Sequence, residues 1–401
     1  MSEKKLILVL NCGSSSIKFS VIDPVAEQIF ASGVIEEIAS KRTKLKFKLG
    51  SANNYQTEDL PELEYSAALN KIIWLLSNQP DLLDKVVAVG HRVVHGGEKF
   101  TSSVIINQEV LQSIADCISL APLHNPAHLL GIKTILEALP KIKQVAVFDT
   151  AFHQTLPEHS YLYALPYQLY RQHKIRRYGA HGTSHRFVAN QASLLLEKPL
   201  TECSLITAHL GNGCSVAAIL NGKSVDTSMG LTPLEGLIMG TRSGDIDPDI
   251  CTYLANNLKY DTTEISNLLN KQSGLLGISE ATSDMRTIEE LSSQGNKSAT
   301  LALEMFCYRL AKYIAAYLVP LGKLDALVFT GGIGENSPLV RAKTITSLKF
   351  LGLVLDPEHN ETKGKYNHQV ITKSLSPMAM VIPTNEELMI AKDTLELTLN
   401  Q

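Results

Sequence analysis

The same short pattern occurs twice in this chain of 401 residues: an apolar run, a turn containing glycine, and a second apolar run. The runs are residues 6–10 and 17–22 in the first copy and residues 205–208 and 215–220 in the second. Gly13 and Gly213 lie in the equivalent turns, and their offset of 200 residues (213 − 13) is about half of the chain. Short apolar runs that turn back at glycine are typical of antiparallel strands. The repeat therefore predicts a duplicated unit that begins with a strand meander.

Each copy continues into a further strand. Asn221-Gly222 follows the second copy, and this dipeptide favours a two-residue hairpin because both of its residues accept positive φ. The second copy therefore predicts two consecutive hairpins, and residues 28–34 form the corresponding third strand of the first copy. The glycine-rich turn of the second copy exposes backbone N–H groups that an anion can approach closely.

Buried strands at residues 86–89, 145–148 and 326–329 alternate with helical segments along the rest of the chain. This alternation predicts an α/β fold, in which ligands collect at the carboxyl ends of strands. A chain of this length exceeds one ordinary core, so we expect two domains that are joined near Thr150 without a low-complexity linker.

The composition excludes several classes of function. The net charge of −3 provides no large basic surface, which argues against a nucleic-acid partner. The six cysteines form no C-x-x-C pair and indicate free thiols in a reducing compartment, so a cytoplasmic protein is expected. The apolar run before Asn11 is too short for a signal peptide. Residues 298–319 are interrupted by charged side chains and predict a core helix, with no membrane partner.

Three glycine-rich turns each follow a buried strand, at residues 11–16, 209–213 and 331–336. Three such turns in one chain favour a site for nucleotide phosphates, although a single one is usually only a turn. The P-loop motif is absent, because Ala217 stands where its first glycine would be relative to Gly222-Lys223-Ser224.

Arg92 and Arg242 each lie beside glycines in a predicted loop. An arginine at a strand end beside glycine is typical of bidentate binding to a carboxylate or phosphate. Asp149 ends a buried strand, where a carboxylate can serve Mg²⁺ or a reacting group, or can cap the following turn. Near the C-terminus, Thr384 and Glu387 fit a capping box, which would leave Glu386 free for other work.

Histidine is concentrated in one part of the chain, since ten of the twelve lie between His91 and His209. Three pairs have the H-x-x-x-H spacing that on a helix could bind zinc: His91/His95, His124/His128 and His181/His185. None contains the glutamate of an HExxH motif, and the first and third pairs surround glycines in predicted loops. We interpret these histidines as hydrogen-bond donors to an anion or as structural residues, with a zinc site as the alternative.

Taken together, these residues resemble the acetate kinase family over residues 8–391. The matching stretches are LVLNCGSSSIKFSVID, GHRVVHGGEKF, APLHNPAHLLGI, VFDTAFHQTLP, RRYGAHGTSH, AHLGNGCSVAAI, DTSMGLTPLEGLIMGTRSGDIDP, FTGGIGENS and PTNEELMIA. Motifs this long and numerous are specific to the acetate and propionate kinase group.

The resemblance implies an α/β fold of two duplicated RNase H-like domains, as in actin, Hsp70 and sugar kinases, flanking a nucleotide cleft. It implies that residues 1–150 with 384–401 form the first domain and residues 151–383 form a nucleotide-binding and dimerisation domain of a homodimer. The implied reaction is the reversible, direct in-line transfer of the γ-phosphoryl group of ATP to acetate, giving ADP and acetyl phosphate. The implied cofactor is Mg²⁺, with Mn²⁺ as a possible substitute.

The resemblance also assigns roles to residues of this chain. The metal positions are Asn11 and Glu386, and the catalytic positions are Arg92, Asp149, His181 and Arg242. The substrate positions, with Arg92, are Val94, Leu123, His124 and Pro233. The nucleotide positions are Lys18, His209, Leu210, Gly211, Asn212, Gly213, Asp284, Met285, Arg286, Gly332, Ile333, Gly334, Glu335 and Asn336.

The acceptor chemistry limits what the protein must supply. Acetate is expected to have a pKa of about 4 to 5 by analogy with Asp and Glu, so it is already ionised at neutral pH and needs no general base. Asp149 is therefore expected to organise Mg²⁺ and Arg92, while Arg92, Arg242, His181 and the metal neutralise the transferring group.

Three alternatives remain from the sequence. Ala180 precedes His181 where some members of the family have Phe, and the smaller side chain could admit propionate or butyrate. A nucleotide-dependent binding or chaperone module on the same fold would bind ATP without forming an acyl phosphate, but would leave Arg92, Arg242 and Asp149 unexplained. A zinc hydrolase is the third alternative.

Overall fold

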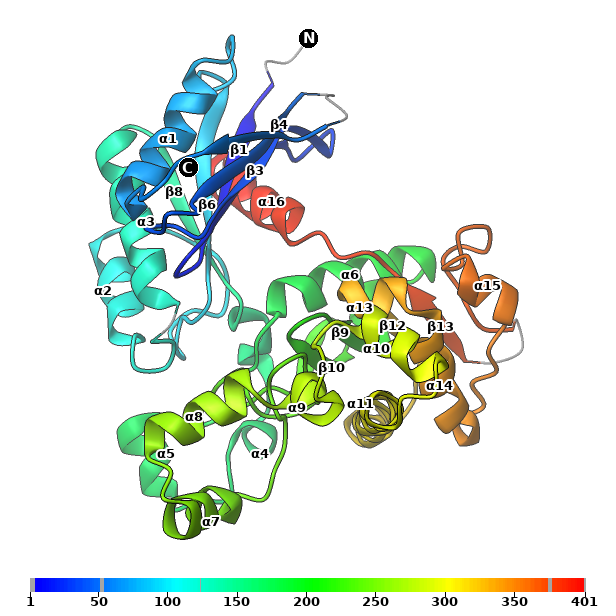
Figure 1. Cartoon of the computed structure of the whole chain (residues 1–401). Coiled ribbons are helices and arrows are strands. Elements are labelled where there is room, and N and C mark those ends of the chain that lie inside the picture. Colours follow the sequence, from blue (N-terminus) through cyan, green and yellow to red (C-terminus); the bar gives the residue numbers. More distant parts are fainter. Residues whose placement is uncertain (1–3, 51–53, 123, 374–376, 400–401) are drawn as a thin grey trace. The chain divides into compact units, whose positions relative to one another are not determined.

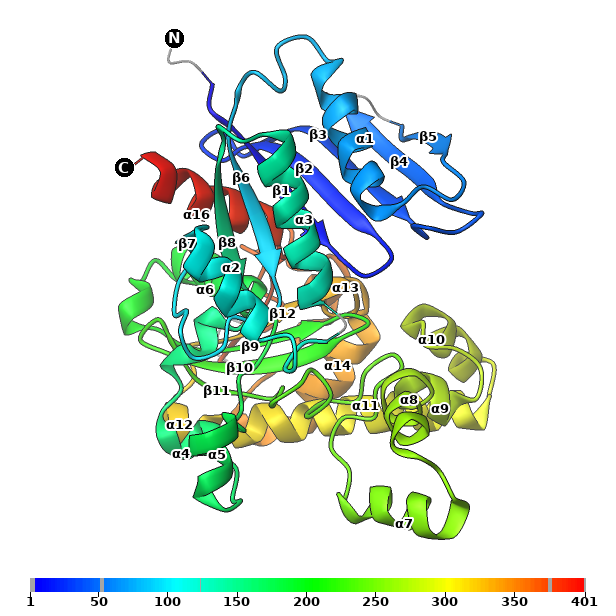
Figure 2. The same cartoon turned by 90° about the vertical axis from the view of Figure 1, so that its left-hand side faces the viewer.

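The structure, a computed structural model, describes residues 4–50, 54–122, 124–373 and 377–399. The chain divides into two compact units, and Figures 1 and 2 show the elements of each. The first unit consists of residues 1–154 and 385–401, and the second consists of residues 155–384. Each unit contains one mixed β-sheet with helices on its faces.

The first unit contains eight strands, four α-helices and the start of a 3₁₀ helix among its described residues. Its elements are β1 (Leu6–Cys12), β2 (Ile17–Asp23), β3 (Gln28–Glu36), β4 (Lys44–Leu49), β5 (Gln56–Asp59), α1 (Tyr65–Ser77), β6 (Val86–Val93), β7 (Val104–Ile105), α2 (Gln108–Asp116), α3 (Asn125–Ala138), β8 (Lys143–Phe148), η1 (Ala151–Thr155) and α16 (Glu386–Leu399).

The sheet of the first unit has the order β5-β4-β3-β2-β1-β6-β8-β7. Strands β1, β2 and β3 pair antiparallel, whereas β6 and β8 run parallel to β1. Strand β1 is apolar along most of its length because both of its faces are covered. Helix α3 packs on one face, and the C-terminal helix α16 packs against β1, β6 and β8 on the other (Figure 1).

The second unit contains the remaining elements. They are α4 (Glu158–Tyr161), α5 (Tyr167–His173), α6 (Gly182–Leu195), η2 (Leu200–Glu202), β9 (Ser204–Leu210), β10 (Cys214–Leu220), β11 (Lys223–Thr227), α7 (Asp249–Leu258), α8 (Thr262–Lys271), α9 (Gly274–Ser279), α10 (Met285–Ser293), α11 (Lys297–Ala316), α12 (Leu318–Leu321), β12 (Ala326–Thr330), α13 (Gly331–Asn336), α14 (Pro338–Ser347), η3 (Lys349–Leu351), α15 (Pro357–Glu361) and β13 (Met378–Val381).

The sheet of the second unit repeats the plan of the first. Its order is β11-β10-β9-β12-β13, in which β9, β10 and β11 pair antiparallel and β12 and β13 run parallel to β9. The series β3-β2-β1-β6-β8 of the first unit has the same order and the same strand directions. The predicted α/β class and its duplication into two RNase H-like domains are confirmed. The hairpin predicted at Asn221-Gly222 is also confirmed, with φ values of 53° and 80°.

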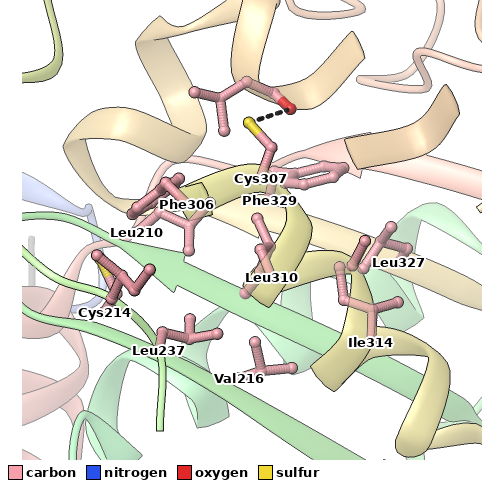
Figure 3. Packing of buried hydrophobic residues seen from close by; sticks show 14 of the residues in the cluster. Leu210, Cys214, Val216, Leu237, Phe306, Cys307, Leu310, Ile314, Leu327 and Phe329 are labelled. Atoms are coloured by element: carbon pink, nitrogen blue, oxygen red, sulfur yellow. Dashed lines mark hydrogen bonds between the residues drawn. The ribbon is translucent and has the colours of Figure 1, made fainter. Parts of the chain in front are cut away.

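The core of the second unit lies between its sheet and helix α11. Figure 3 shows Leu310 and Ile314 of α11 packed near Val216 of β10 and Leu327 of β12. Burying one such side chain contributes about 1.5–3 kcal/mol, so this layer holds the sheet firmly. Helix α11 therefore confirms the core helix predicted for residues 298–319. Within the described ranges, no helix is long and apolar enough to cross a bilayer.

Two local predictions are wrong. Residues 331–336 form the short helix α13 instead of a turn, because Gly331 has a φ of 75° and redirects the chain into helix at once. The capping box predicted from Thr384 and Glu387 does not form. The side chain of Asn385 caps α16 by accepting a hydrogen bond from the Leu388 N–H at 2.9 Å, and Glu387 accepts one from Ser20 at 2.5 Å.

Candidate functional site

Three polar side chains of the first unit lie where parallel strands end. Asn11 is near the end of β1, Arg92 is near the end of β6, and Asp149 directly follows β8. Since β1, β6 and β8 are parallel neighbours, their carboxyl ends share one edge of the sheet. Glu386 is the first residue of α16, which packs on the same three strands. We name Asn11, Arg92, Asp149 and Glu386 the acid–arginine cluster.

Arg92 is the centre of this cluster. Its Nη2 and Nε donate to Oδ2 of Asp149 at 2.5 and 3.0 Å, and its Nη1 donates to Oδ1 of Asn11 at 3.3 Å. Its Nε also lies 3.8 Å from Oε2 of Glu386. Asp149 is only 1% exposed, so its charge depends on Arg92 for compensation.

The acid–arginine cluster carries more negative than positive charge, with two carboxylates around one guanidinium. Burial raises the pKa of Glu386, and Asp149 raises it further, while Arg92 opposes the shift. Burial disfavours the charge of Arg92, but Asp149 and Glu386 outweigh burial and raise the pKa of the guanidinium. A bound cation would relieve the repulsion between the two acids.

The cluster's donor atoms fit Mg²⁺. Asn11 offers an amide oxygen and Glu386 a carboxylate, which are the hard oxygen ligands that this ion prefers. In the part of the chain that the structure describes, no group of three or more His, Cys, Asp or Glu is arranged to hold a metal.

The other predicted residues of the first unit lie on neighbouring elements. Lys18 on β2 pairs in register with Asn11 and has an exposed side chain. Val94 is buried directly after β6, and His124 directly precedes α3. Leu123 lies outside the described residues. His128, one turn into α3, is buried, and burial together with Arg92 lowers its pKa to about 3.

A pocket of about 730 Å³ lies in the second unit beside α10 and α13. It is lined by Gly211, Asn212, Ser283, Asp284, Met285, Arg286, Glu289, Gly332, Ile333, Asn336 and Ser337. Eight of these eleven residues were predicted nucleotide positions. Ser283, Glu289 and Ser337 were missed. Glu289 lies one helical turn after Met285 on α10, so helix periodicity could have identified it.

The other predicted nucleotide residues of this unit do not line the pocket. Glu335 accepts hydrogen bonds from the N–H groups of Gly331 and Thr384, at 3.0 and 3.2 Å. It therefore fixes the backbone around the pocket. Gly334 and Leu210 are both buried, and a Cβ added to Gly334 would lie 3.7 Å from Cβ of Leu210.

The turn between β9 and β10 comprises only Gly211–Gly213, because His209 and Leu210, which were predicted to lie in the turn, belong to β9 and pair with β10. This turn faces two predicted catalytic side chains. A Cβ added to Gly213 would lie 3.4 Å from Nη1 of Arg242 and 3.4 Å from Nε2 of His181. Arg242 Nη1 donates to the carbonyl oxygen of Pro233 at 3.1 Å, and its guanidinium pairs with no carboxylate among the described residues. Burial lowers the pKa of Arg242. A half-buried cation without an acid partner is suited to bind an anion.

His181 occupies an unusual backbone position. It precedes α6 with a φ of 58°, in the left-handed region that residues other than glycine rarely adopt. Its ring lies 4.3 Å from that of His209 between centroids, and its Nδ1 is hydrogen-bonded to Ser215 Oγ at 2.9 Å. Ser215 therefore holds the ring at Nδ1, and Nε2 points to the Gly213 turn.

The predicted loop positions of several residues are wrong. Arg92 and His91 lie within β6, which continues to Val93 because β1 and β8 pair with it on both sides. His185 lies in the first turn of α6, where the glycine of the motif, Gly182, begins the helix. At these positions glycine lies near the end of a strand or helix, where it lets another part of the chain approach the backbone closely, and it does not indicate a loop.

Comparisons with known proteins cover nearly the whole chain. The model of the acetokinase family matches residues 6–392. An acetate kinase of Shewanella baltica (strain OS155 / ATCC BAA-1091) is 56% identical over 397 residues, which are 98% of each chain. A propionate kinase structure from Francisella tularensis is 50% identical with a TM-score of 0.93, over 98% of this chain and 100% of that one. An acetate kinase structure from Porphyromonas gingivalis is 44% identical with a TM-score of 0.91, over 98% and 99%.

Proposed function

The chain belongs to the acetokinase family and catalyses reversible phosphoryl transfer from ATP to acetate, and we propose that the transfer is direct and in line. Such a transfer needs positioning and charge neutralisation more than covalent help. The observation that carries the proposed mechanism is the position of Arg242. This half-buried arginine lies beside the Gly213 turn and Nε2 of His181, and none of the described acidic residues pairs with it.

In this proposal the first unit holds the acceptor. Arg92 would bind the carboxylate of acetate, and Val94 and His124 of the same unit would contact its methyl side. Acetate is already a carboxylate at neutral pH, so no residue has to remove a proton from it. Asp149 keeps Arg92 oriented through the two hydrogen bonds to its Oδ2.

Mg²⁺ is proposed as the cofactor, with Asn11 and Glu386 as the protein groups that would hold it. When bound, Mg²⁺ would neutralise charge on the phosphates of the nucleotide. The raised pKa of Glu386 supports this assignment, because burial and the neighbouring Asp149 disfavour its negative charge and a bound cation would offset both effects. Lys18 is proposed to contact a nucleotide phosphate from its exposed position on β2.

The second unit is proposed to hold the nucleotide. The pocket beside α10 and α13 would take the adenosine part, with Asp284, Arg286 and Gly332 in its wall. The residues His209–Gly213, at the end of β9 and in the turn after it, would bind the phosphates, with backbone N–H groups of the turn as donors. Arg242 and His181 would then stabilise the negative charge that spreads over the transferring phosphoryl group.

The activity is tested by trapping the product. Purified protein with ATP, Mg²⁺ and hydroxylamine should form acyl hydroxamate from acetate, propionate and butyrate, with the highest kcat/KM for acetate. Hydroxylamine reacts with the acyl phosphate, so the coloured product reports phosphorylation of the carboxylate. If ATP binds but no acid yields hydroxamate, a nucleotide-dependent binding module replaces the kinase.

Propionate is the second candidate acceptor. The Francisella tularensis protein, described as a propionate kinase, is 50% identical to this chain, and Ala180 is a small residue next to His181. A higher kcat/KM for propionate than for acetate would keep the mechanism and change the preferred substrate.

Gly332 gives a direct test of the nucleotide pocket. A Cβ at Gly332 meets no heavy atom within 4 Å, so Gly332→Leu should leave the thermal unfolding midpoint unchanged while its side chain occupies the pocket. We expect the KM for ATP to rise about 10- to 100-fold and the KM for acetate to change little.

The neighbouring glycine provides the contrast. Gly331→Leu should fail to fold well, because Gly331 has a φ of 75° and its Cβ would lie 2.8 Å from the carbonyl oxygen of Leu210. An unchanged KM for ATP in Gly332→Leu would place the nucleotide elsewhere.

A homodimer built through the second unit is also proposed. Helices α5, α7 and α8 bury none of their described residues. The exposed apolar side chains on these helices or next to them are Leu165, Tyr167, Ile250, Tyr253, Leu258 and Tyr260. Such a surface is typical of a protein contact. Sedimentation velocity should give the mass of two chains, and a single-chain mass at micromolar concentration would contradict it.

A cytoplasmic location is proposed because all six cysteines are free thiols.

A further inference from the structure

A chain of four polar side chains crosses the face of the second sheet that α6 covers. Thr207 Oγ1 is 2.7 Å from Nδ1 of His185, whose Nε2 is 2.8 Å from Ser215 Oγ. Ser215 Oγ is in turn 2.9 Å from Nδ1 of His181. Thr207, His185 and Ser215 are all fully buried, so these contacts are shielded from competing water.

Each member of this chain has a limited number of protons. A hydroxyl has one hydrogen, and a neutral imidazole has one N–H, so each contact has only one donor. Ser215 Oγ could accept from both imidazoles, but its own hydrogen would then be buried without an acceptor among the described residues, which costs free energy. Two directions remain. Either Thr207 donates to His185, His185 to Ser215, and Ser215 to His181, or every donor and acceptor is reversed.

The surroundings of Thr207 decide between the two directions. Its Oγ1 has no other hydrogen-bond partner among the described residues. In the reversed direction its hydrogen would be buried without an acceptor, which costs free energy. In the forward direction the hydrogens of Thr207, His185 and Ser215 are all donated within the chain. His181 accepts a hydrogen bond at Nδ1 and carries its own hydrogen on Nε2.

We propose that Thr207, His185 and Ser215 are positioning residues that hold neutral His181 in the tautomer with its hydrogen on Nε2. This inference rests on the proposed function, in which His181 donates to the transferring phosphoryl group. Nε2 faces the Gly213 turn, where a hydrogen attracts an anion and a lone pair repels one. The network acts through the ring of His181 and does not contact the substrate.

The tautomer can be measured without any substrate. Full-length protein with ¹⁵N-labelled histidine is compared with the His181→Gln variant, which identifies the His181 signals in a two-bond ¹H–¹⁵N spectrum above the titration of the ring. We expect Nε2 to be the protonated nitrogen of His181. A hydrogen on Nδ1 in the wild-type protein overturns the inference.

A matched pair of variants tests the network at its far end. Thr207→Val removes the hydroxyl at nearly constant shape, whereas Thr207→Ser keeps it. We expect Thr207→Val to mix the two tautomers of His181 and to lower kcat about 5-fold, the effect of one net hydrogen bond, with both KM values little changed. Thr207→Ser should retain the wild-type tautomer and kcat. If Thr207→Val leaves the tautomer unchanged, Thr207 does not set the position of the His181 hydrogen, and the proposed role of the network's far end is overturned.

Ser215→Ala removes the direct partner of His181 and should lower kcat about 10- to 100-fold, as loss of an orienting partner typically does. The spectra test the tautomer of His181 separately from the proposed function, which the activity assay tests. A wild-type protein that forms no acetyl phosphate overturns the proposed function, and the position of the His181 hydrogen still decides the inference.

Discussion

The Arg242→Ala variant is expected to lose about 100- to 1,000-fold in kcat for acetyl phosphate formation, while the KM for acetate changes far less. Arg242 is half-buried and pairs with no carboxylate among the described residues, so its charge is available to the phosphoryl group. Removing one preorganised donor to developing negative charge typically has an effect of this size. Steady-state kinetics with varied ATP and acetate measure both parameters.

The control for this variant is Arg42→Ala in the first unit. Arg42 is exposed and pairs with Glu37 at 2.8 Å, and it has no part in the proposed site or in the proposed dimer surface. Its loss should leave kcat unchanged. Arg242→Lys should recover only part of the activity, because lysine keeps the charge but lacks the planar fork of donors. If Arg242→Ala changed only KM, the residue would serve binding and not the transfer step.

The second large effect is expected for Asp149→Asn. This change removes the buried charge that compensates Arg92, and we expect kcat/KM for acetate to fall at least about 100-fold. Because Asp149 also adds to the negative charge beside Glu386, the Mg²⁺ concentration for half-maximal rate should rise. The shape of the pH–rate profile should stay as in the wild-type protein, since acetate is already ionised and Asp149 transfers no proton.

Asp116→Asn, at an exposed position on α2, is the matched control and should behave as the wild-type protein. If Asp149→Asn keeps the normal Mg²⁺ dependence and loses one limb of the pH–rate profile, Asp149 acts as a general base and the prediction is wrong. The free energy of unfolding should also fall by about 1.5–3 kcal/mol, because the hydrogen bonds of Arg92 to a charged oxygen are weakened. Urea unfolding measures that loss separately from activity.

Much of the architecture could be predicted from local patterns. Gly13 and Gly213 marked equivalent turns, and the two sheets share the same order of their five corresponding strands. Asn221-Gly222 specified its hairpin because few residues other than Asn and Gly adopt two successive positive φ values. Residue type predicted the ends of helices and strands less reliably. Gly331 and Gly182 begin helices, although glycine there suggested turns.

The pairing of side chains could not be predicted in the same way. The alternation of β9 places Thr207 and His209 on one face, but it does not reveal that His185 of α6 lies against them. Likewise, helix spacing relates His181 to His185 without showing that Ser215 bridges their rings. Contacts between separate elements depend on how helix and sheet pack, which sequence spacing alone does not specify.

The residue types at the strand ends could be predicted, because apolar runs and the polar residues after them are local properties of the chain. Local pattern was therefore enough to place Asp149 directly after its strand and Asn11 near the end of its own, although β1 continues through Asn11 to Cys12 and the turn predicted from residue 11 begins later. The folded chain was needed to show that Arg92 donates to Asp149, 57 positions away, and that Glu386 from the last helix joins them. Those partners meet because β1, β6 and β8 pair in parallel and α16 packs across them, and such long-range packing leaves no local trace in the sequence.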